Sequence, residues 1–100
     1  MAAQHWDTDD AGYTNWLLAH PHGFQANARR PIQGNYFRIH LATCKLPDRS
    51  DPATAHPRTG NAYSKVTADT IGDLIGWAEQ NLKLAPGDVS YCKLCGPRGA

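Results

Sequence analysis

The stretch Tyr91-Cys92-Lys93-Leu94-Cys95-Gly96-Pro97 places two cysteines, with two residues between them, on a tight turn that contains a glycine. Two thiolates at this spacing form the usual half of a tetrahedral zinc site. The glycine lets backbone N–H groups turn toward the sulfur atoms. A tetrahedral site needs two more ligands, so this turn predicts a metal site that joins it to a distant part of the chain.

The other two ligands are predicted in the stretch Tyr36-Phe37-Arg38-Ile39-His40-Leu41-Ala42-Thr43-Cys44, which contains the only further cysteine. His40 lies four residues before Cys44. Side chains four residues apart project from the same side of a helix, and also of a strand, so both can reach one point. The sequence therefore predicts a structural Zn²⁺ held by three cysteines and a histidine: His40, Cys44, Cys92 and Cys95.

Other interpretations of these residues remain open. A redox pair at Cys92 and Cys95 would ordinarily lie in a strand-then-helix context, which the sequence does not indicate. A disulfide would leave one of the three cysteines unpaired, and no secretory signal is evident. His40 could instead be a hydrogen-bonded strand histidine, and Cys44 a small core residue.

Length and composition are typical of a small soluble domain. The chain has 100 residues, of which 41% are hydrophobic and 19% charged, and no apolar run approaches the length that crosses a membrane. These values predict a single domain over residues 1–100 with no membrane partner, which the metal motif above and the elements below make a zinc-stapled α+β domain. Reduced cysteines and the lack of a signal peptide predict a cytoplasmic location.

The N-terminal part of the chain predicts short elements. Residues 1–10 are interpreted as a frayed lead-in, followed by a short helix over 11–20 that ends before Pro21. The segment 20–23, which contains proline and glycine, is predicted to be a turn. The alternating segment 24–27 is predicted to be an edge strand.

The rest of the chain predicts two strands and one long helix. Over 35–42, Phe37, Ile39 and Leu41 alternate with polar residues, which is typical of a strand with one apolar face. Residues 45–61, rich in proline, are predicted to be a long loop. A second strand over 62–66 is expected to run antiparallel to the first.

The helix predicted over 68–82 has an apolar stripe at helical spacing, formed by Ile71, Leu74, Ile75, Ala78 and Leu82. Neither a helix nor a sheet can bury its apolar face alone. The predicted fold class is therefore α+β: a small antiparallel sheet of two or three strands, covered by this amphipathic helix plus a short N-terminal helix, and stapled by zinc.

Most of the chain resembles a small actinobacterial module of unknown activity. The resemblance is carried by the stretch 16–27, the strand and cysteine at 36–44, Tyr63-Ser64-Lys65-Val66, the helix around Trp77, and the Cys-x-x-Cys at 92–95. That module has a Trp-Leu…Pro-Asp-Gly-Phe start, a Leu-His-x-Ala-x-Cys strand and a terminal Cys-x-x-Cys. This chain has His22 where the pattern has aspartate. The resemblance implies a module found both alone and beside restriction-type nuclease domains.

The charge is distributed unevenly along the chain. Net charge is +1, yet the segment 29–65 contains seven basic residues against Asp48 and Asp51. Such a segment is either a plain solvated surface or a face for phosphates or acidic proteins. The residues predicted to bind nucleic acid or another partner are six basic and two aromatic ones: Arg29, Arg30, Arg38, Arg49, Arg58, Lys65, Tyr36 and Tyr63.

Three functions compete on this evidence. The first is a zinc-binding module that binds nucleic acid through the basic middle segment. The second is a protein-interaction module or small regulator that recognises an acidic partner. The third is a metal-dependent hydrolase or nuclease that uses His20, His22 and an aspartate, although no nucleophile-and-base pair or paired-carboxylate motif stands out.

Overall fold

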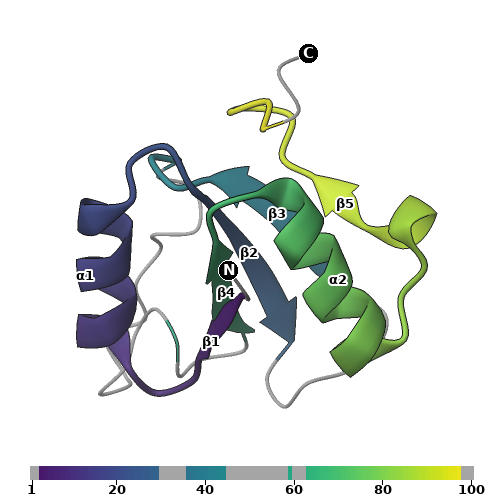
Figure 1. Ribbon diagram of the computed structural model, residues 1–100, viewed down its shortest axis with the longest axis horizontal. Coiled ribbons are helices and arrows are strands. Elements are labelled where there is room, and N and C mark those ends of the chain that lie inside the picture. Colours follow the sequence, from purple (N-terminus) through teal and green to yellow (C-terminus); the bar gives the residue numbers. More distant parts are fainter. Residues whose placement is uncertain (1–2, 30–35, 45–58, 60–62, 98–100) are drawn as a thin grey trace.

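The computed structural model describes residues 3–29, 36–44, 59 and 63–97, and these form an α+β fold with a five-stranded mixed sheet and two α-helices (Figure 1). The strand order across the sheet is β1-β4-β2-β3-β5. In chain order the elements are β1 (Gln4–Trp6), α1 (Asp10–Ala19), β2 (Phe24–Arg29), β3 (Phe37–Leu41), β4 (Tyr63–Ala68), α2 (Ile71–Leu82), a 3₁₀ helix (Pro86–Asp88) and β5 (Ser90–Tyr91).

The sheet is larger than the predicted two or three antiparallel strands. Residues 4–6, predicted to be frayed, pair with β4, and residues 90–91 pair in parallel with β3. These additions have three and two residues. Such short segments carry no periodicity of their own, because a strand this short is defined only by the neighbour it pairs with.

The central strand is β2, which was predicted to be an edge. It pairs antiparallel with β3 on one side and with β4 on the other, so β3 and β4 run parallel to each other and do not touch as neighbours. The prediction that residues 62–66 run antiparallel to the strand at 35–42 was therefore wrong. The buried residues of β2 beneath α2 are Ala26 and Ala28, and their short side chains give the strand little of the apolar signal that marks a central position.

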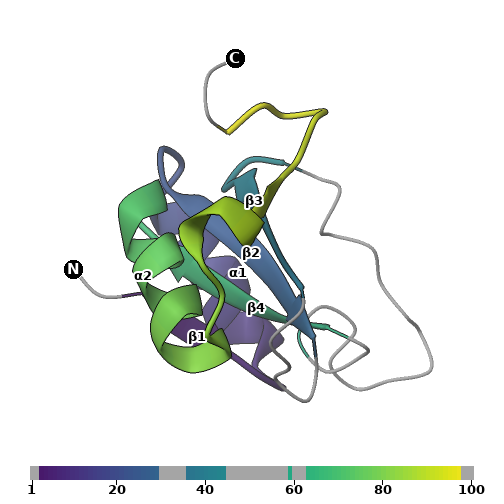
Figure 2. The same ribbon diagram turned by 90° about the vertical axis from the view of Figure 1, so that its right-hand side faces the viewer.

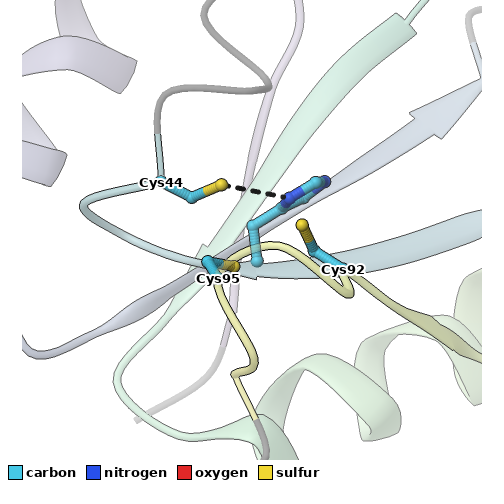
Figure 3. Close-up of side chains that lie close together, drawn as sticks. Cys44, Cys92 and Cys95 are labelled. Atoms are coloured by element: carbon cyan, nitrogen blue, oxygen red, sulfur yellow. Dashed lines mark hydrogen bonds between the residues drawn. The ribbon is translucent and has the colours of Figure 1, made fainter.

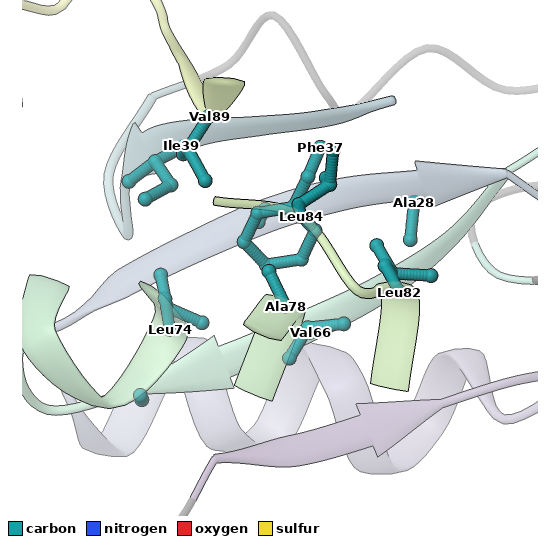
Figure 4. Close-up of a cluster of buried hydrophobic side chains, with 11 residues drawn as sticks. Ala28, Phe37, Ile39, Val66, Leu74, Ala78, Leu82, Leu84 and Val89 are labelled. Atoms are coloured by element: carbon teal, nitrogen blue, oxygen red, sulfur yellow. The ribbon is translucent and has the colours of Figure 1, made fainter. Parts of the chain in front are cut away.

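Helix α2 covers one face of the sheet, as its stripe predicted. The Thr70 side chain accepts a hydrogen bond from the Asp73 N–H and caps the helix start. Leu74, Ala78 and Leu82 are buried against a sheet surface that includes Phe37 and other apolar residues labelled in Figure 4. Trp77 lies at the edge of this core and stacks on Phe37, with ring centroids 5.7 Å apart.

Helix α1 lies on the opposite side of the sheet, as Figure 2 shows with α2 in front of the sheet and α1 behind it. Tyr13 of α1 is fully buried, and its hydroxyl donates a hydrogen bond to the Gln25 side chain of β2. The helix begins after Asp9, whose carboxylate accepts from the Gly12 N–H. Within the described residues, no helix is long and apolar enough to cross a membrane.

The face of the sheet toward α1 is polar. Alternation along the strands and the pairing register place its side chains in three rows across β4, β2 and β3. We call this surface the polar face, and define it by the rows Tyr63-Arg29-Tyr36, Lys65-Asn27-Arg38 and Thr67-Gln25-His40, in which Tyr36 is the residue before β3 and continues its register. Its third row leads directly to the candidate metal ligands.

Candidate metal centre and polar face

Two pairs of residues that lie far apart in the sequence come together beside β3. The side chains of His40, Cys44, Cys92 and Cys95 each offer one ligand atom, and all four atoms lie within 4.8 Å of one another. His40 belongs to β3, Cys44 follows the turn after it, and both remaining cysteines follow β5. Figure 3 shows the three cysteine sulfur atoms directed toward a common centre. The four residues therefore lie close enough to hold a metal ion.

Backbone hydrogen bonds hold the cysteine turn against β3. The Cys92 N–H donates to the Ile39 carbonyl over 2.9 Å, and the Leu41 N–H donates to the Cys95 sulfur over 3.3 Å. Within the turn, the Gly96 N–H donates to the Cys92 carbonyl. Gly96 has a φ of 58°, a conformation that glycine adopts without steric cost, which explains the glycine at this position.

The Cys92 thiol is electrostatically prepared to lose its proton. Burial raises the pKa of Cys92, but hydrogen bonds to its sulfur from the backbone of Cys95 and Leu94, and from the side chains of Cys95 and Cys44, outweigh that effect. The net result is a pKa below the ordinary thiol value. Because the thiolate is the form that ligates metals, this arrangement favours metal binding.

His40 is also in the protonation state that a ligand needs. Burial, together with the positive charges of Arg38 and Lys65, lowers the pKa of His40 to about 4, so the imidazole is neutral at neutral pH. Its Nδ1 lies 3.6 Å from the Cys44 sulfur. Its Nε2 is buried and has no hydrogen-bond partner. A neutral imidazole whose Nδ1 lies beside the Cys44 sulfur can offer that nitrogen to a metal ion.

Gln25 hydrogen-bonds the backbone of the turn that carries Cys44, and this role was not predicted from the sequence. Its amide nitrogen donates toward the carbonyl oxygens of Leu41, Ala42 and Cys44, at 3.2, 3.1 and 3.4 Å. Its oxygen accepts from the Tyr13 hydroxyl. Gln25 thus joins α1 to the turn that carries Cys44. No local sequence signal marks a glutamine for this role, because the role depends on where β2 lies.

Replacing Gln25 by glutamate tests this support. Gln25→Glu keeps the shape but turns the donor toward three carbonyl oxygens into an acceptor, so we expect the free energy of unfolding to fall by about 2 kcal/mol. Urea denaturation would measure the change. Gln80→Glu, the same substitution at an exposed position of α2, is the matched control and should change stability by less than about 0.5 kcal/mol. Equal stability of the two variants would contradict the role of Gln25.

The residues predicted to bind a partner divide into two groups. Arg30, Arg49 and Arg58 lie outside the described residues. The other five all belong to the first two rows of the polar face. Arg29 is exposed and Arg38 half-buried, whereas Lys65 is only 3% exposed and so cannot present its side chain freely at the surface. Sequence reasoning treated Lys65 as a surface cation because its strand neighbours were unknown.

The first row of the polar face is an aromatic and basic cluster. The rings of Tyr36 and Tyr63 lie with centroids 5.4 Å apart and their planes inclined at 47°. The Arg29 guanidinium lies 5.7 Å from the centre of the Tyr36 ring, within the range of a cation–π contact. These residues come from the end of β2, the residue before β3 and the start of β4, and only the sheet topology brings them together.

His20 and His22 take part in a turn, as predicted. His20 stacks on Trp16 with ring centroids 4.1 Å apart, and its Nδ1 lies 2.8 Å from the Trp16 carbonyl oxygen. His22 is exposed. Among the described residues, the only group of three or more histidine, cysteine or acidic side chains arranged to hold a metal is the one beside β3. The described chain therefore gathers no metal-ligand group around His20 and His22.

The comparisons with known proteins leave the site to be interpreted from its own geometry. No protein-family model, curated protein or solved structure matches the chain. The resemblance to the actinobacterial module accordingly rests on its sequence motifs.

Proposed function

We propose that this chain is a small binding module in which a structural Zn²⁺ secures the cysteine turn, and in which the first two rows of the polar face, away from His40, bind single-stranded nucleic acid. The metal cluster and the aromatic row lie at opposite ends of β3, so the two roles do not compete for the same residues. The observation that carries the nucleic-acid proposal is the convergence of Tyr36, Tyr63 and Arg29.

The donor set supports zinc as the metal. Three thiolates and one imidazole, arranged tetrahedrally, are typical of structural zinc. With Zn–S near 2.3 Å and Zn–N near 2.05 Å, the nitrogen and a sulfur of such a site are separated by about 3.6 Å. The observed distance from His40 Nδ1 to the Cys44 sulfur is 3.6 Å. Four protein ligands leave no position for a reactive water, so we assign the metal a structural task rather than a catalytic one.

The first row of the polar face supports nucleic acid as the partner. Nucleobases stack on aromatic side chains, and arginine contributes both charge and cation–π contacts. Unpaired bases reach such a surface more readily than bases within a duplex. An acidic protein, the second candidate, would use the arginines but would not need two half-buried tyrosines that lie together.

Fluorescence anisotropy with a labelled ten-nucleotide oligothymidine, dT10, tests the proposal. Tyr36→Ala should weaken binding about tenfold, because stacking on an aromatic residue contributes about 1–3 kcal/mol per base. Tyr36→Phe keeps the ring and should retain most of the affinity. Lys83→Ala removes an exposed cation from the end of α2, on the other side of the sheet, and serves as the charge control.

The same titration, repeated at several salt concentrations, tests the phosphate contacts and separates the candidates by whether dT10 binds at all. Affinity for dT10 should fall as salt rises, because phosphate contacts release counterions. Absence of dT10 binding, or equal affinity of Tyr36→Ala and Tyr36→Phe, would overturn the nucleic-acid proposal. Binding of an acidic protein without any binding of dT10 would favour the second candidate.

A further inference from the structure

The middle row of the polar face contains two buried polar atoms with no hydrogen-bond partner. The register places Asn27 of β2 between Arg38 of β3 and Lys65 of β4. Asn27 Oδ1 and Arg38 Nε are both buried and unpartnered, while Lys65 has an interaction of its own. Buried polar atoms are nearly always hydrogen-bonded, so these two atoms on neighbouring strands leave one acceptor and one donor for a group outside the chain to satisfy.

The two unpartnered atoms have opposite hydrogen-bonding roles. Asn27 Oδ1 can only accept a hydrogen bond, and Arg38 Nε–H can only donate one. The residues that carry them are both half-buried, so part of each side chain reaches solvent. A ligand that satisfies both must therefore present a donor beside an acceptor.

This requirement excludes phosphate as the group that binds here. A phosphate oxygen would accept from Arg38, but it offers no donor to Asn27 and would place a negative charge against the Asn27 oxygen. The edge of a nucleobase presents adjacent donors and acceptors, and asparagine and arginine are the side chains that most often bind such edges. Arg38 would then contact bases, not the backbone phosphates that its charge alone suggests.

The aromatic row of the polar face lies next to Asn27 and Arg38. Tyr36, the residue before β3, is two residues before Arg38, and Arg29 is two residues after Asn27 on β2. Two residues along a strand span about 7 Å, which is comparable to the width of a base. A base held against the aromatic row can therefore direct its polar edge toward Asn27 and Arg38.

We infer that Asn27 and Arg38 bind the hydrogen-bonding edge of an unpaired nucleobase. This inference rests on the proposed function, because it assumes that single-stranded nucleic acid occupies the polar face. It deepens that function by making the site a reader of bases and not a general phosphate-binding surface.

The test compares dT10 with an oligonucleotide of the same length in which the central thymines are replaced by difluorotoluene. This analogue keeps the shape and stacking surface of thymine but lacks its hydrogen-bonding groups. The wild-type chain should bind dT10 at least fivefold more tightly than the analogue. Asn27→Leu should lose that preference, while Tyr36→Ala should weaken both oligonucleotides by similar factors.

The outcomes separate the inference from the proposed function. If dT10 and the analogue bind the wild-type chain equally well, the base-edge inference is overturned and the proposed function stands. If neither oligonucleotide binds, both are overturned. The comparison of dT10 with the analogue on the wild-type chain tests the inference even if Asn27→Leu fails to fold, and Asn27→Ser is a smaller polar replacement that can be used in its place.

Discussion

Cys92→Ser is expected to release the metal and to lower the free energy of unfolding by about 3 kcal/mol or more. A serine hydroxyl does not supply the thiolate that the cluster requires, and metal binding in small domains is coupled directly to folding. Cys92 is the most buried of the three cysteines and receives several hydrogen bonds at its sulfur. We expect Cys95→Ser to have a similar effect.

Native mass spectrometry and thermal unfolding followed by circular dichroism would measure both consequences. The wild-type chain should carry one zinc per molecule, and Cys92→Ser none. The melting temperature should fall by roughly 12–24 °C, because each 1 kcal/mol shifts it by about 4–8 °C in a domain of this size. A chelator should reproduce the effect in the wild-type chain and leave the variant unchanged.

A substitution within the same turn provides the control. Lys93 lies between the two cysteines and is exposed, so Lys93→Ser should retain the metal and nearly all the stability. The prediction fails if Cys92→Ser keeps the metal content and melting temperature of the wild-type chain. In that case His40 and the cysteines would be core residues that happen to lie together.

The loss of stability should begin at the C-terminal part of the fold. Strand β5 pairs with β3 through only two residue pairs, Arg38 with Ser90 and Ile39 with Tyr91. The cysteine turn adds the Cys92 and Leu41 hydrogen bonds to this short contact. A metal ion bound by the four side chains would add a further attachment of this turn to β3.

The proximity of His40 and the three cysteines could be predicted from the sequence, because metal chemistry limits which residues can act together. Cys92 and Cys95 have the spacing of a half-site, and only one further cysteine, with His40 nearby, was available to complete it. The α2 stripe was equally readable, because Leu74, Ala78 and Leu82 recur at helical spacing. Both signals are local patterns with a direct physical cause.

The polar face could not be predicted, because it depends on which strands are neighbours. Alternation places Arg38 and His40 on one side of β3, but nothing in the sequence pairs Asn27 with both Arg38 and Lys65. The buried residues of β2 in the core are alanines, which give too weak an apolar pattern to indicate a central strand. Gln25 was missed for the same reason: its partners on α1 and on the Cys44 turn become neighbours only in the folded chain.

Leu74→Ala is expected to lower the free energy of unfolding by about 3 kcal/mol without removing the metal. Leu74 is completely buried where α2 meets the sheet, and truncation of a buried leucine leaves a cavity that its surroundings fill only in part. The matched control is Leu18→Ala, since Leu18 of α1 is 76% exposed and its loss should cost less than about 0.5 kcal/mol.

The comparison of Leu74→Ala with Cys92→Ser separates the contribution of apolar packing under α2 from that of the proposed metal site. The α2 face is stabilised by buried apolar area, whereas in the proposed function β5 and the cysteine turn would be held by a metal that His40 and Cys44 also bind. At a temperature where Leu74→Ala is still folded, it should therefore retain one zinc per chain in native mass spectrometry. Loss of zinc from the folded Leu74→Ala protein would contradict this division, and would mean that packing of α2 on β3 positions His40 for the metal.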